Sequence, residues 1–172
     1  MKKIIIAAMA LFVIAGCNTS KEQKWDTTVV PAVNGLQIPA GFENWAVIAV
    51  SHRIDRGSVR AILGNDIAVE AARSGNTNPY PDGAIIAKVA WEAKEDEAWP
   101  DAIVPGKFLI AEFMYKDSKK FAANGTGWGW ARWIGPERKP YGENKEFEQE
   151  CIDCHSPVEE KDWVFTHGAP FK

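Results

Sequence analysis

The pattern of apolar and polar positions predicts that most of the chain is β-structure. Five short runs are rich in β-branched and aromatic residues and are bounded by glycine, proline or polar clusters, as strands usually are. These runs are residues 45–51, 59–63, 84–91, 108–115 and 127–134, and the first two are expected to form a hairpin across 55–58. A short helix is expected over 67–73, because Asn65 or Asp66 can cap its start and Gly75 can end it. With a second, polar helix over 143–154, these elements predict an α+β fold dominated by an antiparallel sheet.

The strand expected at 84–91 carries one charged residue within an apolar run. Its period of two places Lys88 on the same face as Ile86 and Ala90. The opposite face takes Ile85, Ala87, Val89 and Trp91. If the Lys88 amine faces an apolar pocket, its charged form is disfavoured and a neutral, nucleophilic amine becomes accessible. The alternative is that the stem of Lys88 lies on the sheet while its ammonium group reaches solvent.

Two further strands carry features that point to contacts with other groups. In the strand at 108–115, Glu112 is the single charge on a face that it is expected to share with Phe108, Ile110 and Met114. In the strand at 127–134, small residues alternate with aromatic ones after a Gly-Thr-Gly turn. Glycines opposite large rings suggest that another group approaches the backbone closely there.

The first residues have the features of an export signal. Lys2 and Lys3 precede an apolar run of about a dozen residues, which is too short for a stable membrane span. The run ends in Ile-Ala-Gly before Cys17 and resembles the lipobox of bacterial lipoproteins. That resemblance implies cleavage before Cys17, acylation of its thiol and, with Asn18 next, sorting to the outer membrane. Ordinary signal cleavage that leaves a spare thiol is the alternative.

These features divide the chain into three parts. Residues 1–16 are expected to be a signal peptide, 17–33 a lipidated N-terminus with a polar linker, and 34–172 one domain with one core. Loss of Lys2 and Lys3 changes the formal net charge from −3 to −5, so no nucleic-acid partner is expected. We expect a protein on the periplasmic side of a bacterial envelope that is held to a membrane only by its lipid anchor.

The sequence Cys151-Ile-Asp-Cys154-His155 is a C-x-x-C-H motif near the end of the chain. Two thiols at this spacing can each add to a vinyl group of one heme, and the histidine that follows is then held against the iron. The alternative is a structural zinc site or a redox pair. Zinc normally needs a second pair of ligands, and once Cys17 is assigned to lipid no cysteine remains to supply one.

Few residues could occupy the other axial position of that iron. Electron-transfer cytochromes usually place a methionine or a second histidine there. After removal of the signal peptide, Met114, His52 and His167 are the only candidates. We therefore expect an open distal site, which is typical of a heme that binds small molecules or acts in catalysis.

The mature chain resembles the cytochrome P-460 family over nearly its whole length after about residue 33. The matching stretches are SVRAILGND (58–66), YPDGAIIAKVAW (80–91), PGKFLIAEFMYKDSKKFA (105–122), GWGWARW (127–133) and ECIDCHSPVEEKDWVFT (150–166). A C-x-x-C-H motif fits any c-type cytochrome. Its position near the C-terminus, after a strand that carries PDG-x4-K, is much more specific.

The resemblance implies a mainly antiparallel β-fold, a homodimer, and one covalently attached heme c with His155 as the proximal ligand. Lys88 falls at the position where members with a lysine can cross-link its amine to a heme meso carbon, and their best-known activity is the oxidation of hydroxylamine to nitrogen oxides. We therefore expect a hydroxylamine-oxidising enzyme that passes electrons to a redox partner such as a soluble cytochrome. The alternatives are a nitric oxide-binding cytochrome of the related c′-β kind, which lacks the cross-link, and a plain electron-transfer cytochrome.

Other side chains could complete such a site. Arg60 could donate to a bound N-oxide or nitrosyl, although an arginine in a hairpin is often solvated. Oxidation of hydroxylamine releases protons, so a carboxylate near the heme could act as a base. Glu112 and Glu146 are the candidates, and Glu143, Glu148 and Glu150 compete with Glu146 for its position.

Overall fold

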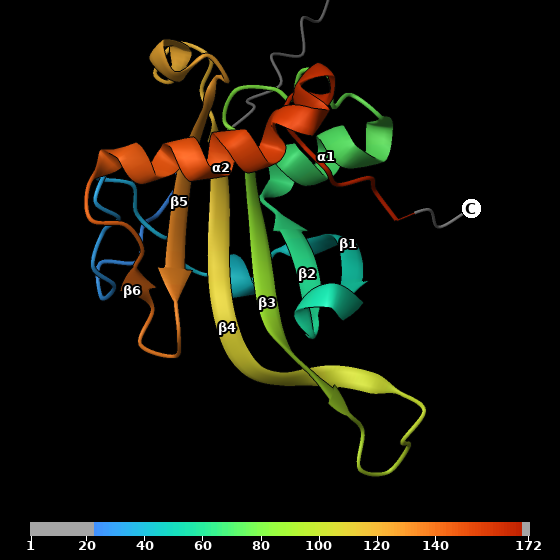
Figure 1. Ribbon diagram of the computed structural model, residues 1–172. Coiled ribbons are helices and arrows are strands. Elements are labelled where there is room, and N and C mark those ends of the chain that lie inside the picture. The colour runs from blue at the N-terminus through green and yellow to red at the C-terminus, as the bar shows by residue number, and fades with distance from the viewer. Residues whose placement is uncertain (1–22, 170–172) are drawn as a thin grey trace, which may run out of the picture.

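The centre of the molecule is a six-stranded antiparallel sheet in which each strand pairs with the next along the chain (Figure 1). It is seen in a computed structural model that describes residues 23–169, so Cys17 and the expected signal peptide lie outside the described residues. The strands are β1 (Ala46–Arg53), β2 (Ser58–Gly64), β3 (Ile85–Glu95), β4 (Ile103–Lys116), β5 (Trp128–Ile134) and β6 (Lys139–Pro140). This meander, with two short α-helices, confirms the α+β fold. Strand β6 was not predicted, because two residues carry no pattern.

Both α-helices lie on one face of the sheet, which we call the helix face. They are α1 (Asp66–Ser74) and α2 (Glu148–His155). Within residues 23–169 the chain also forms five 3-10 helices, which are not confined to this face: η1 (Phe42–Asn44), η2 (Ile54–Arg56), η3 (Ala122–Asn124), η4 (Lys145–Phe147) and η5 (Ser156–Lys161). Asn65 caps α1 by accepting from the Ala68 N–H at 3.0 Å, and Gly75 ends it, as the sequence predicts. In Figure 1, α2 crosses β3, β4 and β5 near one end of each. Among residues 23–169, no helix is long and apolar enough to cross a bilayer.

Apolar side chains fill both faces of the sheet. On the helix face, Ile86, Met114 and Trp130 belong to a core that includes one side of α1 and Cys151 of α2. On the opposite face, Phe113 and Trp133 pack against the chain that precedes β1. The sheet is therefore covered by helices on one side and by an irregular segment on the other.

Residues 23–33, which the sequence suggests are a linker, pack on the side of the sheet opposite the helices. Ala32 is buried in the core there, and the Trp133 indole N–H donates to the Val30 carbonyl at 2.9 Å. Trp25 forms a β-bridge with Pro39. The part of the expected linker that the structure describes is thus packed as part of the domain.

The strand faces agree with the alternation in the sequence, with one exception. Ile86 lies in the helix-face core, while Ile85 and Val89 lie in the opposite one. Phe108, expected beside Glu112, packs instead in the core opposite the helices. Register shifts in β3–β4 lie on both sides of the Trp91–Phe108 pair, and the shift between this pair and Ala90–Ile110 places Phe108 on the face opposite to that of Ile110.

Gly129 in β5 confirms the expectation of a close approach to the backbone. The ring of Phe121 lies directly on it, and a methyl group at this position would overlap the ring. The absence of a side chain at Gly129 therefore lets the loop after β4 close onto the sheet.

Strands β3 and β4 continue beyond the sheet as a paired arm, which bends away from the domain in Figure 1. Glu95 pairs with Ile103 near its tip, and Trp99 in the turn is 69% exposed. The sequence pattern ends β3 too early and begins β4 too late, because the arm has no regular apolar alternation and its β4 side contains Pro105 and Gly106.

Candidate functional site

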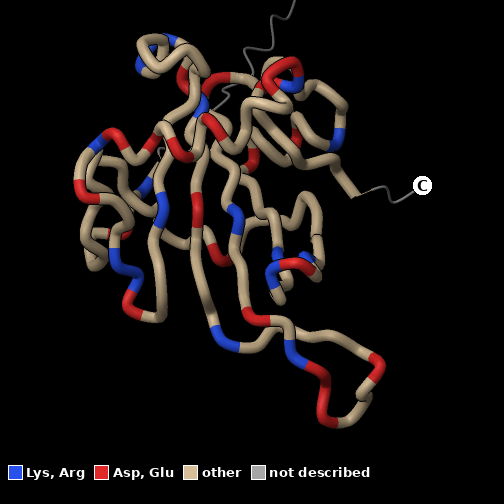
Figure 2. Tube along the Cα trace, viewed as in Figure 1, with Lys and Arg blue, Asp and Glu red and all other residues tan. Residues whose placement is uncertain are grey.

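Three charged side chains lie in one row on the helix face, and we call them the charged row: Lys88 of β3, Glu112 of β4 and Arg132 of β5. The register pairs Lys88 with Glu112 and Glu112 with Arg132 directly across neighbouring strands. Lys88 Nζ forms an ion pair with Glu112 Oε2, and Arg132 Nε donates to Glu112 Oε1 at 2.6 Å. Figure 2 shows this alternation of charge across the three central strands. One carboxylate therefore bridges two cations.

The pKa of Glu112 reflects this position. Burial alone would raise it, but the charges of Lys88 and Arg132 and their hydrogen bonds outweigh burial and hold the pKa below its usual value. Glu112 is consequently a carboxylate and, while paired in this way, a weak base. The expectation that Lys88 faces an apolar pocket is not met, because its cross-strand neighbour is an anion.

Arg60 of β2 lies near the charged row. It is half-buried, and its Nε is buried without a hydrogen-bond partner among the described residues. Burial is the main reason that its pKa is lowered, and the charge of Glu112 acts in the opposite direction. An unpaired buried donor costs about 1–3 kcal/mol, so it marks a place for an acceptor that the polypeptide does not supply.

His155, the last residue of α2, faces the sheet between two aromatic rings. Its ring centroid lies 4.8 Å from that of Trp130 and 5.0 Å from that of Phe165. Its Nδ1 lies 2.7 Å from the Trp163 carbonyl, so Nδ1 carries the proton and Nε2 keeps its lone pair. Burial lowers the pKa of His155, and the charges of the row act on it more weakly. The ring is therefore neutral, oriented and ready to bind a metal through Nε2.

The two cysteines of the motif occupy the same short helix. Cys151 is buried under α2, one helical turn before His155, whereas Cys154 is exposed. Burial raises the pKa of Cys151 to about 11, so it is a thiol rather than a thiolate. Neither is in a disulfide. A buried thiol, an exposed thiol and an oriented imidazole on one helix fit the attachment of a heme.

A buried ion pair positions the carbonyl that holds His155. Asp162 and Trp163 both have left-handed backbone conformations, with φ of 54° and 64°. Lys116 Nζ lies 2.6 Å from Asp162 Oδ1, and Oδ2 accepts from the Tyr80 N–H at 2.8 Å. The Trp128 indole donates to the Asp162 carbonyl at 2.9 Å. Sequence reasoning missed Lys116 and Asp162, because the two lie far apart in the chain and neither belongs to a local motif.

The other carboxylates expected near the site stand apart from Lys88. Glu146 is exposed on η4, before α2 begins. Glu148 accepts from the Asn34 amide and Glu150 from the Tyr141 hydroxyl, the latter at 2.9 Å. Of the expected carboxylates, Glu112 is the one that pairs with Lys88.

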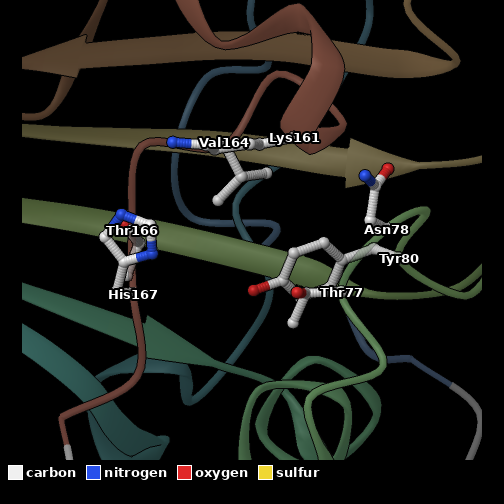
Figure 3. A pocket seen from close by; sticks show the side chains of 7 residues that line it. All are labelled: Thr77, Asn78, Tyr80, Lys161, Val164, Thr166 and His167. Atoms are coloured by element: carbon white, nitrogen blue, oxygen red, sulfur yellow. The ribbon is translucent and has the colours of Figure 1, made fainter.

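The three candidates for a second axial ligand also lie elsewhere. Met114 is buried in the helix-face core, and His52 is exposed on edge strand β1, on the side away from the helices. His167 lines a separate cavity beside Tyr80 and Val164 (Figure 3).

The comparisons with known proteins agree with this geometry. The family model described as Cytochrome P460 matches residues 39–166, a span that contains the charged row, the C-x-x-C-H motif and Asp162. No curated protein matches the chain.

Proposed function

The chain belongs to the cytochrome P460 family, and on this premise we propose that it is an exported enzyme that oxidises hydroxylamine, or a related small N-oxide, at one covalently attached heme. The observation that carries the proposal is the charged row beside His155. Lys88 falls at the position that the resemblance to the family assigns to the cross-link, and it pairs with Glu112, which would become a proton acceptor once the charge of Lys88 is lost.

The family implies a heme, and the residues present fit one. Cys151 and Cys154 would form the thioethers, and His155 Nε2 would bind the iron while Trp163 holds the other ring nitrogen. The unpaired Nε of Arg60 would donate to an oxygen atom of the cofactor or of its ligand. The heme would supply an iron that binds the nitrogen compound and accepts its electrons.

Glu112 is the proposed proton acceptor. Oxidation of hydroxylamine to nitric oxide releases three electrons and three protons; the electrons pass to a redox partner and the protons need a base. Arg132 holds one oxygen of Glu112 at 2.6 Å and leaves the other directed at Lys88. Loss of the positive charge on Lys88 would remove one of the two cations that keep the pKa of Glu112 low, and Glu112 would become a stronger base.

A bond from Lys88 to the porphyrin would remove that charge. Starting from the ammonium group, the link joins Nζ to a ring carbon that loses its hydrogen, and three protons and two electrons leave. Hydrogen peroxide can take the two electrons and two of the protons, because it becomes water in doing so, and the third proton passes to solvent. Lys88 is half-buried on the same face as His155, and its charge acts on the pKa of His155, so the amine lies near the side of the molecule where the heme would sit.

The test compares Lys88→Leu with Lys94→Leu. Lys94 is on the same strand, but it lies on the exposed arm and pairs with Glu97. A heme that is cross-linked to Lys88 should have a strongly red-shifted Soret band in the ferrous state. The Lys88 variant should keep its heme but lose this band and the turnover of hydroxylamine. The Lys94 variant should keep both. Undiminished turnover in Lys88→Leu would refute the proposal.

Nitric oxide binding of the c′-β kind is the second candidate, and the ion pair itself favours it. An amine held by Glu112 as an ammonium group is not nucleophilic. Peptide mapping of peroxide-treated protein separates the two functions. A peptide containing Lys88 that migrates with the heme peptide of Cys151 supports the oxidase, whereas a free amine supports the gas-binding protein.

We further propose a lipid anchor at Cys17 and a homodimer. Mature protein should partition into detergent and carry diacylglycerol on its N-terminal peptide. Sedimentation of protein lacking the anchor should give the mass of two chains. A soluble product with a different N-terminus would refute the anchor and leave the heme chemistry unaffected.

A further inference from the structure

A cavity of about 220 Å³ lies behind the segment that holds His155, outside the site described above. In Figure 3 its walls are the loop that precedes β3, which carries Thr77 and Tyr80, and the chain after η5, which carries Val164, Thr166 and His167. Neither the charged row nor the C-x-x-C-H motif contributes a side chain to it. The heme chemistry leaves this cavity unexplained.

Tyr80 provides a hydrogen-bond donor to the cavity. The residue is 2% exposed, its backbone N–H is bound by Asp162, and its ring packs edge-on against Trp128. In Figure 3 its hydroxyl group points into the cavity, toward the side where Thr166 and His167 lie. The hydroxyl makes no hydrogen bond to any residue that the structure describes. Burial raises its pKa, so the group is an O–H donor at neutral pH. The oxygen is accessible from the cavity, so a ligand or water there can accept its hydrogen bond.

The other polar side chains around the cavity can also donate hydrogen bonds. Lys161 adds an ammonium group, and Thr77 and Thr166 add hydroxyls that can donate. Within residues 23–169, no aspartate or glutamate side chain lines the cavity. Asp162, next to the lining residue Lys161, is bound to Lys116 and to the Tyr80 N–H, so its charge is compensated. A lining of donors with a cation and without an acid favours a ligand that accepts hydrogen bonds and carries negative charge.

We propose that this cavity binds a small oxyanion, with Tyr80 and Lys161 as its main donors. The volume suits an anion the size of phosphate together with water. The Asn78 amide is already used, because it donates to the Glu160 carbonyl at 2.7 Å, and it serves to fix the loop.

The position of the cavity gives such an anion an effect on the heme site, a step that rests on the proposed function. Val164 and Thr166 line the cavity, whereas Trp163 and Phe165, which alternate with them along the chain, contact His155. An anion bound to Thr166 and Lys161 would brace the short segment that orients the imidazole. It would therefore change the strength of the bond between iron and His155.

Calorimetric titration of the mature holoprotein with sodium phosphate, at constant ionic strength and with sodium chloride as the control, tests the site itself. Phosphate should give saturable heat and chloride should not. Tyr80→Phe removes a single oxygen atom and should weaken binding by about tenfold or more, as should Lys161→Met. Lys120→Met, a surface lysine over Phe121, should leave the affinity unchanged. Sodium acetate tests whether a carboxylate serves as well.

The outcomes separate the site from its effect. No phosphate heat above that of chloride, or equal affinity in wild type, Tyr80→Phe and Lys161→Met, would overturn the oxyanion site. The iron–histidine stretching frequency of the ferrous protein, measured by resonance Raman spectroscopy, should shift with phosphate in wild type and not in Tyr80→Phe. Binding without that shift would overturn the coupling to His155. Neither result depends on hydroxylamine turnover, so failure here is distinguishable from failure of the proposed function.

Discussion

Asp162→Asn should destabilise the protein strongly, because it leaves a buried lysine without a counter-charge. The Lys116 and Asp162 side chains are 6% and 8% exposed and lie 2.6 Å apart. Asparagine has nearly the same shape and still offers an oxygen to the Tyr80 N–H. The change therefore removes little besides the negative charge. The Lys116 ammonium would then keep its contact with the Trp128 ring, whose centroid is 4.9 Å away, and a weaker interaction with the charge of Asp82.

The expected loss of stability follows from the unpaired charge of Lys116 in this variant. Breaking a buried pair by removing one partner costs about 3–5 kcal/mol, against a total stability of about 5–15 kcal/mol for a domain of this kind. At about 2–4 °C per kcal/mol, the melting temperature should fall by about 6–20 °C. The Asp162 carbonyl and the Trp163 carbonyl lie in the same turn, so the orientation of His155 should loosen as well.

Urea unfolding followed by far-ultraviolet circular dichroism measures the effect, with two controls. The double variant Lys116→Met with Asp162→Asn removes both charges and should recover most of the loss, since it leaves no uncompensated buried charge. Asp82→Asn weakens two exposed hydrogen bonds to Ser118 and should cost only about 1 kcal/mol. The reasoning is wrong if Asp162→Asn unfolds within about 1 kcal/mol of wild type, or if the double variant is no more stable than the single one.

Three further changes test other parts of the fold. Gly129→Ala should cost about 1–3 kcal/mol in urea unfolding, because the Phe121 ring occupies the space of the new methyl group; an unchanged midpoint would contradict that contact. Asn65→Ala should cost about 1–2 kcal/mol, because one side-chain oxygen accepts from the N–H groups of both α1 and β3 at 3.0 Å; a Ser variant should recover part of the loss. The pKa of Glu112 is lowered in the folded state, so its contribution to stability is present above its unfolded value of about 4.5 and is lost as the pH falls through the lower folded value. Glu112→Gln should make the acid limb of the stability–pH curve shallower, and an equally steep limb would show that Glu112 does not contribute to it.

The sequence predicts the parts of the site that depend on local signals. Alternation along β3 and β4 places Lys88 and Glu112 on one face, because side chains on a strand repeat every second residue. The cap of α1 follows from Asn65 and Gly75 for a similar reason. The C-x-x-C-H motif places two thiols and an imidazole on one helix, since its spacing matches a helical turn.

The parts that the sequence does not predict depend on register and on distant contacts. A bulge in the β3–β4 pair places Phe108 on the other face, and no residue in the alternating run predicts this bulge. The partner of Lys88 is set by strand pairing, so the sequence gives its face but not the ion pair. The sequence does not predict Arg132 as the second partner of Glu112, because this contact also depends on strand pairing. Lys116 and Asp162 meet only after the whole sheet and the segment beyond α2 have packed.

The charged row explains how one carboxylate could be both a structural group and a base. With Lys88 and Arg132 both cationic, Glu112 is stabilised as an anion. Its two ion pairs help to hold β3, β4 and β5 together on the helix face. Conversion of the Lys88 amine to an uncharged, ring-bonded nitrogen would leave the Arg132 contact in place and remove the other attraction. Glu112 would keep its position while its pKa rose toward the range in which a base accepts protons and releases them again. If Lys88 forms the proposed cross-link, maturation of the cofactor and activation of the base would be one event, since both would follow from the chemistry of a single lysine.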